Sequence, residues 1–144
     1  MTVTHSTFSL ERTYPVPPER VFAAWADPAA KARWFVTNGT HELDFRVGGR
    51  EAIHAAGPDG TELTFVSTYH DIVPERRIVY SGELSGAGAL ATVSVTTIEL
   101  VGEGDGTRLV LTEQGTFLDG AEEPAWREQG TSDQLARLGK ELGS

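Results

Sequence analysis

The sequence predicts an α+β fold in which a curved antiparallel sheet of six or seven strands surrounds a long C-terminal helix and two short helices follow the first strand. Apolar residues recur at helical spacing near both ends of the chain and alternate with polar residues from Thr40 to Gly115. Glycine-rich segments divide the alternating region into strands joined by tight turns. The 144 residues are a usual length for one domain, so we expect a single domain over residues 1–144.

The first strand and the first helix are predicted by alternation followed by proline. Residues Thr7–Tyr14 alternate between polar and apolar side chains, and Pro15 ends the strand. A helix begins after Pro17, because proline and the acidic Glu19 suit a first helical turn. Apolar residues then recur at helical spacing up to Trp25.

The second short helix is predicted at the pair Asp27-Pro28. Proline disfavours the helical conformation at Asp27, so the first helix ends there. The Asp27 carboxylate can accept a hydrogen bond from a free backbone N–H and begin the next helix, which we expect over Ala29–Phe35.

The middle of the chain predicts an antiparallel meander of six strands. Two of them exceed the usual five or six residues, which indicates a strongly curved sheet. The predicted strands are His41–Val47, Arg50–Ala56, Thr61–Val73, Arg76–Glu83, Ala89–Val101 and Thr107–Gln114.

A C-terminal helix is predicted by leucines at helical spacing. From Trp126 to Leu142 it would be about 26 Å long, and six or seven strands make a sheet about 24 to 29 Å wide. One helix could therefore cross the whole sheet. Gly130 weakens this helix, and the segment after it resembles a capping box, so a shorter helix could begin at Ser132 instead. We expect a bend near Gly130.

Composition excludes several classes of function. The chain has no cysteine, which excludes disulfides, thiolate metal sites and cysteine nucleophiles. The formal net charge of -9 opposes binding to nucleic acid or to an anionic membrane surface. The first residues lack the pattern of a secretory leader, and no apolar run is long enough to span a bilayer, so we expect a cytoplasmic protein without a membrane partner.

Titratable side chains suggest one candidate for chemistry. Glu113 shares a strand face with Leu109 and Leu111, so a pocket on that face would hold a carboxylate able to act as acid or base. The alternative is a solvated Glu113 beyond the edge of the core. The spacing of the histidines has no metal signature, although neighbouring strands could bring together His41, His54 and His70. We expect no metal and no cofactor.

Aromatic side chains on one strand face indicate a cavity. The sheet and the single long helix enclose more surface than that helix can cover, so a ligand cavity is predicted between them. A solid core is the alternative. The predicted lining of the cavity is Trp34, Phe45, Leu63, Phe65, Tyr69, Tyr80, Leu111, Leu135 and Leu138, with Tyr69, Tyr80 and Glu113 as polar anchors.

Several segments in order along the chain resemble one family. They are 16–28 (VPPERVFAAWADP), 32–35 (ARWF), 44–49 (DFRVGG), 59–60 (DG), 72–78 (IVPERRI) and 106–113 (GTRLVLTE). They are similar to the bacterial family that resembles the C-terminal domain of the heat-shock-protein-90 ATPase activator, within the START-like or SRPBCC superfamily. The resemblance implies a helix-grip, birch-pollen-allergen-like fold with an apolar cavity. The family's frequent Gly-Trp pair stands here as Gly130-Thr131, which implies a larger cavity or a different ligand.

Three functions follow as expectations. The first is a protein that binds a small apolar or aromatic ligand, lipid-like or polyketide-like, between the sheet and the last helix. The second is a cyclase or dehydratase that uses Glu113 or a histidine as the base and a tyrosine hydroxyl to polarise a carbonyl. The third, implied by the family resemblance alone, is an interaction module that stimulates a chaperone ATPase. A homodimer and a chaperone contact stay open as partners, and no catalytic residue is assigned beyond the candidate Glu113.

Overall fold

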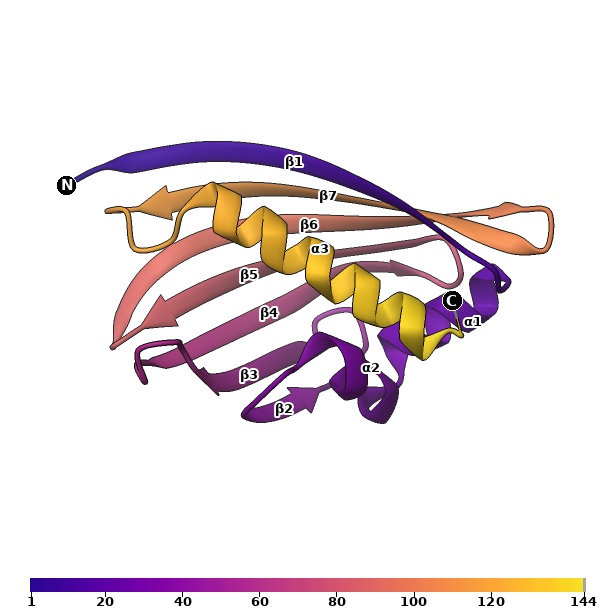
Figure 1. Cartoon of the computed structure of the whole chain (residues 1–144), viewed down its shortest axis with the longest axis horizontal. Helices are drawn as coiled ribbons and strands as arrows, with labels where there is room; N and C mark the ends of the chain where they lie inside the picture. Colours follow the sequence, from indigo (N-terminus) through magenta and orange to yellow (C-terminus); the bar gives the residue numbers. More distant parts are fainter. Residues whose placement is uncertain (144) are drawn as a thin grey trace.

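Seven antiparallel strands form one strongly curved sheet (Figure 1), described by a computed structural model of residues 1–143. The strand order is β1-β7-β6-β5-β4-β3-β2, so the last six strands form the predicted meander and β1 pairs with β7. The strands are β1 Val3–Tyr14, β2 Thr40–Leu43, β3 Arg50–Ala56, β4 Glu62–Val73, β5 Arg77–Gly86, β6 Ala89–Glu103 and β7 Gly106–Leu118. The helices are α1 Pro18–Ala26, α2 Pro28–Phe35 and α3 Pro124–Glu141. The predicted helix-grip fold is confirmed.

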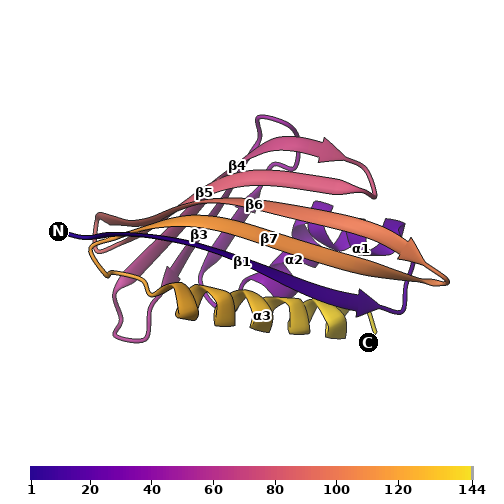
Figure 2. The ribbon, with the colours of Figure 1, turned by 90° about the horizontal axis from the view of Figure 1, so that it is seen from above.

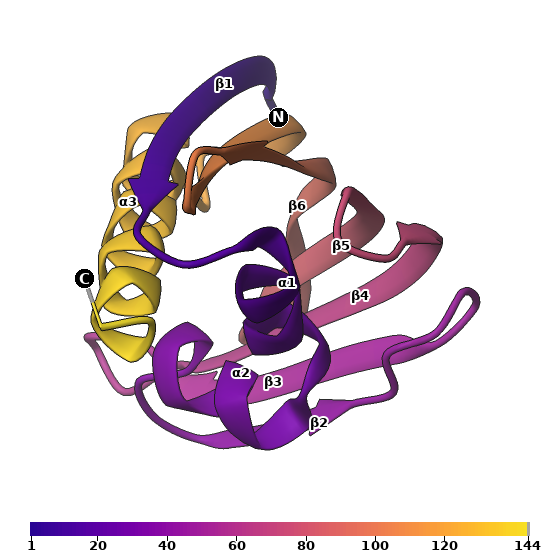
Figure 3. The same ribbon diagram turned by 90° about the vertical axis from the view of Figure 1, so that its right-hand side faces the viewer.

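The three helices occupy different parts of the concave side. Helix α3 runs along one side of the sheet (Figure 2), where it packs against β1 and α2. Helices α1 and α2 close one end (Figure 3). The register shifts between Tyr69 and Asp71 on β4 and between Leu84 and Ser85 on β5, and such irregularities add local twist. Because α3 lies toward β1, it leaves the concave face of β3, β4 and β5 less covered.

Asp27 joins the first two helices as the sequence predicts. Its backbone N–H donates to the Ala23 carbonyl at the end of α1. Its side chain accepts a hydrogen bond of 2.9 Å from the backbone N–H of Ala30 in the first turn of α2. One residue thus ends one helix and caps the next, which sets the sharp angle between them.

Helix α3 runs straight through Gly130, so both the predicted bend and the shorter helix from Ser132 are wrong (Figure 1). Pro124 lies in the first turn, where proline is favourable. Thr131 donates its hydroxyl to the carbonyl of Arg127, so it continues the helix instead of capping a new one. Packing of the later leucines against the sheet outweighs the weak helix propensity of one exposed glycine.

Strand β2 is shorter than predicted and ends at Leu43 instead of Val47. After Leu43 the chain turns, and the turn is held against β4. Gly48 donates its N–H to the Tyr69 carbonyl at 2.8 Å, and Tyr69 donates back to Gly49. Gly48 has a φ of 82°, which favours glycine. The alternating residues of this segment therefore belong to a turn docked on the sheet edge.

The core lies where the C-terminal half of α3 meets the sheet and the first two helices. Leu138 is fully buried, and Tyr14 donates its hydroxyl to the Leu135 carbonyl at 2.9 Å. The largest core residues are Tyr14, Val21, Trp25, Trp34, Phe35, Tyr69, Ile78, Tyr80, Ile98, Leu100, Leu109, Leu111, Leu135, Leu138 and Leu142. Within residues 1–143, no helix has the length and apolar character needed to cross a membrane.

Truncation of Leu138 should destabilise the fold strongly. We expect Leu138→Ala to lower the free energy of unfolding by about 2–5 kcal/mol, because it leaves a cavity in packed core. Leu90→Ala is the control, since Leu90 is 40% exposed. Urea denaturation followed by tryptophan fluorescence measures both, and equal losses would contradict this placement of the core.

Candidate functional site

A polar row crosses the concave face of the sheet. Tyr80 on β5 pairs with Thr96 on β6, which pairs with Glu113 on β7. Glu113 is only 6% exposed and accepts a hydrogen bond of 2.8 Å from the Thr96 hydroxyl. The alternative of a solvated Glu113 is therefore wrong. Burial raises the pKa of Tyr80, and so do the charges of Glu113 and Glu51, so its hydroxyl keeps its proton.

Arg127 from α3 neutralises this buried carboxylate. Its Nη1 lies 3.2 Å from Glu113 Oε2, and its Nη2 lies 2.9 Å from Glu122 Oε1. Burial by itself favours a neutral guanidinium, but the two carboxylates outweigh it and raise the pKa of Arg127. Arg127 was not among the site residues predicted from the sequence. The sequence pattern that could have predicted Arg127 is its spacing. Arg127 and Thr131 lie eight and four residues before Leu135, so they extend the inward face of the helix toward its N-terminus.

A second row, of small residues, lies beside the polar row. Ser67, Gly82, Ser94 and Gly115 are successive cross-strand partners from β4 to β7. A Cβ atom at Gly82 would lie 2.7 Å from Cζ of Phe65, so the Phe65 ring lies over the glycine. Because these side chains are small and the Phe65 ring lies over Gly82, space remains above this part of the sheet.

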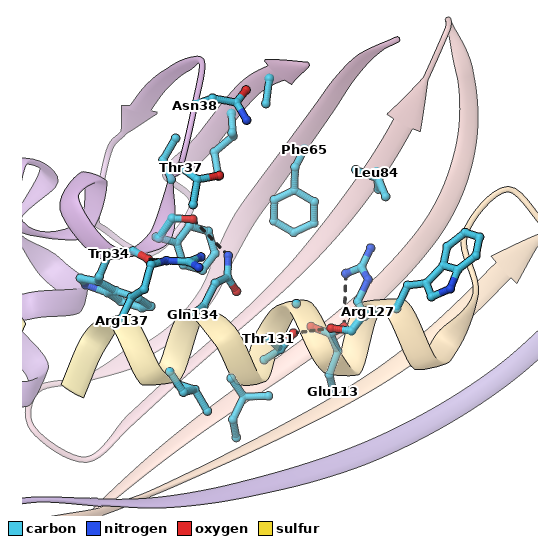
Figure 4. Close-up of a pocket in the computed structure, with 18 of the residues that line it drawn as sticks. Trp34, Thr37, Asn38, Phe65, Leu84, Glu113, Arg127, Thr131, Gln134 and Arg137 are labelled. Carbon is cyan, nitrogen blue, oxygen red and sulfur yellow. Dashed lines mark hydrogen bonds and ion pairs between the residues drawn. The ribbon is translucent and has the colours of Figure 1, made fainter. Parts of the chain in front are cut away.

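That space is a cavity of about 320 Å³ between α3 and the concave face (Figure 4). Its floor is Ile53, Ala55, Phe65, Tyr80, Leu84 and Leu111. Its closed end is Trp25, Trp34 and Phe35, and the α2–β2 loop contributes Val36, Thr37 and Asn38. Its helix wall is Trp126, Arg127, Gly130, Thr131, Gln134, Leu135 and Arg137, with Glu113 and Glu122 beside Arg127. It is a mixed pocket with aromatic and aliphatic walls and charged groups along α3.

The structure brings six of the predicted lining residues to this cavity. They are Trp34, Phe65, Tyr80, Leu111, Glu113 and Leu135. The other predicted residues lie elsewhere. Leu138 is in the core, Leu63 lies near Gly86, and Phe45 packs edge-on against Tyr69 with ring centroids 5.0 Å apart. Tyr69 belongs to a separate buried network, because α1 and α2 cover that end of the concave face.

This network surrounds a fully buried ion pair. Lys31 Nζ on α2 lies 2.8 Å from Glu51 Oε1 on β3, and both side chains are 0% exposed. Tyr69 donates its hydroxyl to Glu51 Oε1 at 3.1 Å and accepts from Lys31 at 3.2 Å. His41 Nε2 lies 2.8 Å from Glu51 Oε2. Burial by itself raises the pKa of Glu51, but Lys31 and the hydrogen bonds from His41 and Lys31 hold it below its usual range.

Aromatic rings enclose the lysine. Its ammonium lies 4.1 Å from the ring centroid of Phe35 and 5.2 Å from that of Trp25. These rings and Tyr80 also line the cavity, so Lys31 lies behind the cavity wall. The pair of Lys31 and Glu51 was not predicted from the sequence, because a lysine in a short helix is usually solvated. The signal was its spacing of three and four residues from Trp34 and Phe35, which places it on the apolar helix face.

The predicted histidines do not come together. His41 contacts Glu51, His54 Nδ1 lies 3.4 Å from the Thr64 hydroxyl, and His70 Nε2 lies 2.7 Å from the Ser81 hydroxyl. Within residues 1–143, no cluster of three or more histidine and acidic side chains could hold a metal ion. The three-histidine alternative therefore has no geometric support.

Comparison with known proteins identifies the family. Residues 15–143 match the family described as "Activator of Hsp90 ATPase homolog 1-like protein". This chain belongs to that family. The family lies within the START-like, or SRPBCC, superfamily, as the resemblance implied. None of the curated proteins matches the chain.

Solved structures share the fold of this family member over nearly its whole length. A protein from Rhizobium leguminosarum is 38% identical, with a TM-score of 0.94 over 99% of this chain and 97% of that one. The protein Mll3558 from Rhizobium loti is 44% identical, with a TM-score of 0.92 over 98% and 99% of the two chains. DynU16, a protein in the dynemicin biosynthetic locus, is 21% identical with a TM-score of 0.73 over 96% of this chain and 47% of that one, and this likeness shows the fold alone.

Removal of the buried lysine charge should cost much stability. We expect Lys31→Met to lower the free energy of unfolding by about 3–5 kcal/mol, because Glu51 stays buried without its cation. Lys31→Met/Glu51→Met should lose less than the sum of the two single variants. Urea denaturation measures the cycle. Strict additivity would contradict direct coupling, and Arg33→Met, at an exposed pair with Glu141, is the control with a small effect.

Acid should weaken the fold through Glu51. Its pKa in the folded state lies below its value in the unfolded chain, so the unfolded chain binds the proton first as the pH falls. The contribution of the ionised carboxylate is complete above about pH 4.3 and is lost as the pH falls through the folded-state pKa. Unfolding free energy measured between about pH 6 and 3 should fall less steeply in Glu51→Gln. Parallel curves would reject this role for Glu51.

Proposed function

We propose that this protein binds a small apolar or aromatic ligand, lipid-like or polyketide-like, in the cavity between the concave sheet face and α3. The observation that carries the proposal is the cavity itself. Its volume of about 320 Å³ lies at the lower end of the usual range for small-molecule sites. Aromatic rings form its closed end, and aliphatic side chains with Phe65 form its floor. A few polar groups converge on it, as in sites that orient a ligand.

The position of α3 supports binding over a solid core. The helix fills the core with Leu135 and Leu138, but its earlier inward positions hold Arg127 and the smaller Thr131. The family resemblance implies a tryptophan at position 131, and the smaller threonine of this chain leaves room that a large ring would fill.

Catalysis is the second candidate, and Glu113 is the observation that favours it. The Glu113 carboxylate is buried, and it lines the same cavity as Tyr80, whose side chain carries a hydroxyl. Its oxygens, however, already accept hydrogen bonds from Thr96 and Arg127. These bonds fix the position of the carboxylate, which suits it to anchor a ligand hydroxyl. Chaperone ATPase activation stays a prediction from the family resemblance.

A tryptophan at position 131 should block binding. Thr131→Trp places a large ring in the cavity, so we expect the affinity for the neutral fluorescent probe N-phenylnaphthylamine to fall about tenfold or more. Ala136→Trp is the matched control, because Ala136 is exposed on the same helix. Fluorescence titration of the unchanged protein and both variants measures the effect. No binding by the unchanged protein, or equal binding by both variants, would overturn the proposal.

A further inference from the structure

One basic group at the cavity has no acidic partner within the described chain. Arg137 projects from α3 beside Trp34, and its Nε donates to the Trp34 carbonyl at 2.9 Å (Figure 4). Among residues 1–143, no carboxylate oxygen lies within 4.0 Å of its nitrogens. Asp133, one turn earlier, accepts a hydrogen bond from Gln129 instead. The terminal amino groups of Arg137 are therefore available to a ligand.

The other arginine of the cavity differs in this respect. Arg127 pairs with both carboxylates that line the cavity, Glu113 and Glu122. Ten residues of helix separate the two arginines, which corresponds to about 15 Å along α3. The cavity thus has an end with a net negative charge near Arg127, where one arginine pairs with two carboxylates, and a positive end near Arg137.

Other polar side chains line the same cavity as Arg137. Gln134 uses its amide N–H on the Phe35 carbonyl, which helps to hold the α2–β2 loop in place. Asn38 accepts a hydrogen bond from the Ala56 N–H through its carbonyl oxygen, so its amide nitrogen stays free to donate. Thr37 is exposed beside it. Figure 4 shows Gln134 and Arg137 rising from α3 toward Thr37 and Asn38.

We propose that the ligand carries an anionic group, such as a carboxylate, and that Arg137 binds this group. The apolar body of the ligand then lies over Phe65 and Leu84. This inference rests on the proposed function of the cavity and adds the charge of its ligand. A guanidinium binds planar anions through two N–H groups, and partial burial at the cavity strengthens such a pair.

A purely structural role for Arg137 predicts a different result. Its bond to Trp34, with that of Gln134 to Phe35, satisfies carbonyls at the end of α2. Only one of the five guanidinium N–H groups is needed for this. A structural role would affect every ligand alike, whereas an anion site discriminates by ligand charge.

Two probes with one aromatic skeleton provide the test. N-phenylnaphthylamine is neutral, and anilinonaphthalene sulfonate carries one negative charge on the same rings. The net charge of -9 would by itself disfavour the anion. We nevertheless expect the unchanged protein to bind the sulfonate about tenfold more tightly than the neutral probe. Fluorescence titration at low ionic strength measures both affinities.

Variants assign the preference to one side chain. Arg137→Gln should abolish it, so that this variant binds the two probes with affinities within about twofold of each other. Arg137→Lys should retain most of it. Arg33→Gln, which removes an exposed arginine paired with Glu141 and outside the cavity lining, should not change it. Circular dichroism checks that each variant folds. If Arg137→Gln does not fold, two other results support the site: the unchanged protein loses its preference for the sulfonate at high salt, and Arg137→Lys retains the preference at low salt.

The outcomes separate this inference from the function on which it rests. Equal or weaker binding of the sulfonate by the unchanged protein overturns the anion site while the cavity still binds. An equal loss of both probes in Arg137→Gln also overturns it. Failure of both probes to bind, or binding insensitive to Thr131→Trp, rejects the ligand cavity itself and the anion site with it.

Discussion

The buried pair of Lys31 and Glu51 is the interaction on which the site depends. It joins α2 to β3 inside the protein, where water cannot compete and where each charge would be costly without the other. Tyr69 and His41 occupy the remaining positions around the carboxylate. Because Trp25, Phe35 and Tyr80 surround the ammonium and also line the cavity, a fixed lysine implies a fixed aromatic end wall. The charge pair thereby preorganises an apolar surface.

The cavity then results from a change of side-chain size along α3. Its inward stripe begins with Arg127 and Thr131 and continues with Leu135 and Leu138, so one helix face changes from lining a space to filling a core. The row of small residues from Ser67 on β4 to Gly115 on β7 also leaves space above the sheet. Burial of the charged groups at the N-terminal half costs free energy, which Glu113 and Glu122 offset by pairing with Arg127. A core built for stability alone would place leucines there.

Periodicity predicted the order and type of nearly every element, because alternation and helical spacing follow directly from which faces are buried. It did not predict the end of β2, which depends on hydrogen bonds to Tyr69 far along the chain. The aromatic and leucine positions of the cavity were predictable for the same reason as the strands. Lys31 and Arg127 were missed because each is buried only by virtue of a carboxylate that lies 20 or 14 residues away in sequence. Pairing of charges across elements has no period.

Charge placement also limits which ligand suits the cavity. An overall charge of -9 repels anions at long range, but salt screens that field beyond about 8 Å at physiological ionic strength. Within that distance the nearest charges decide, and beside Trp34 the charged side chain that lines the cavity is Arg137. A single anionic group on an apolar body gains this contact and the aromatic end wall together. A polyanion would bring further negative charges toward Glu113 and Glu122, which have one arginine between them, so the proposed site for one anionic group would disfavour several.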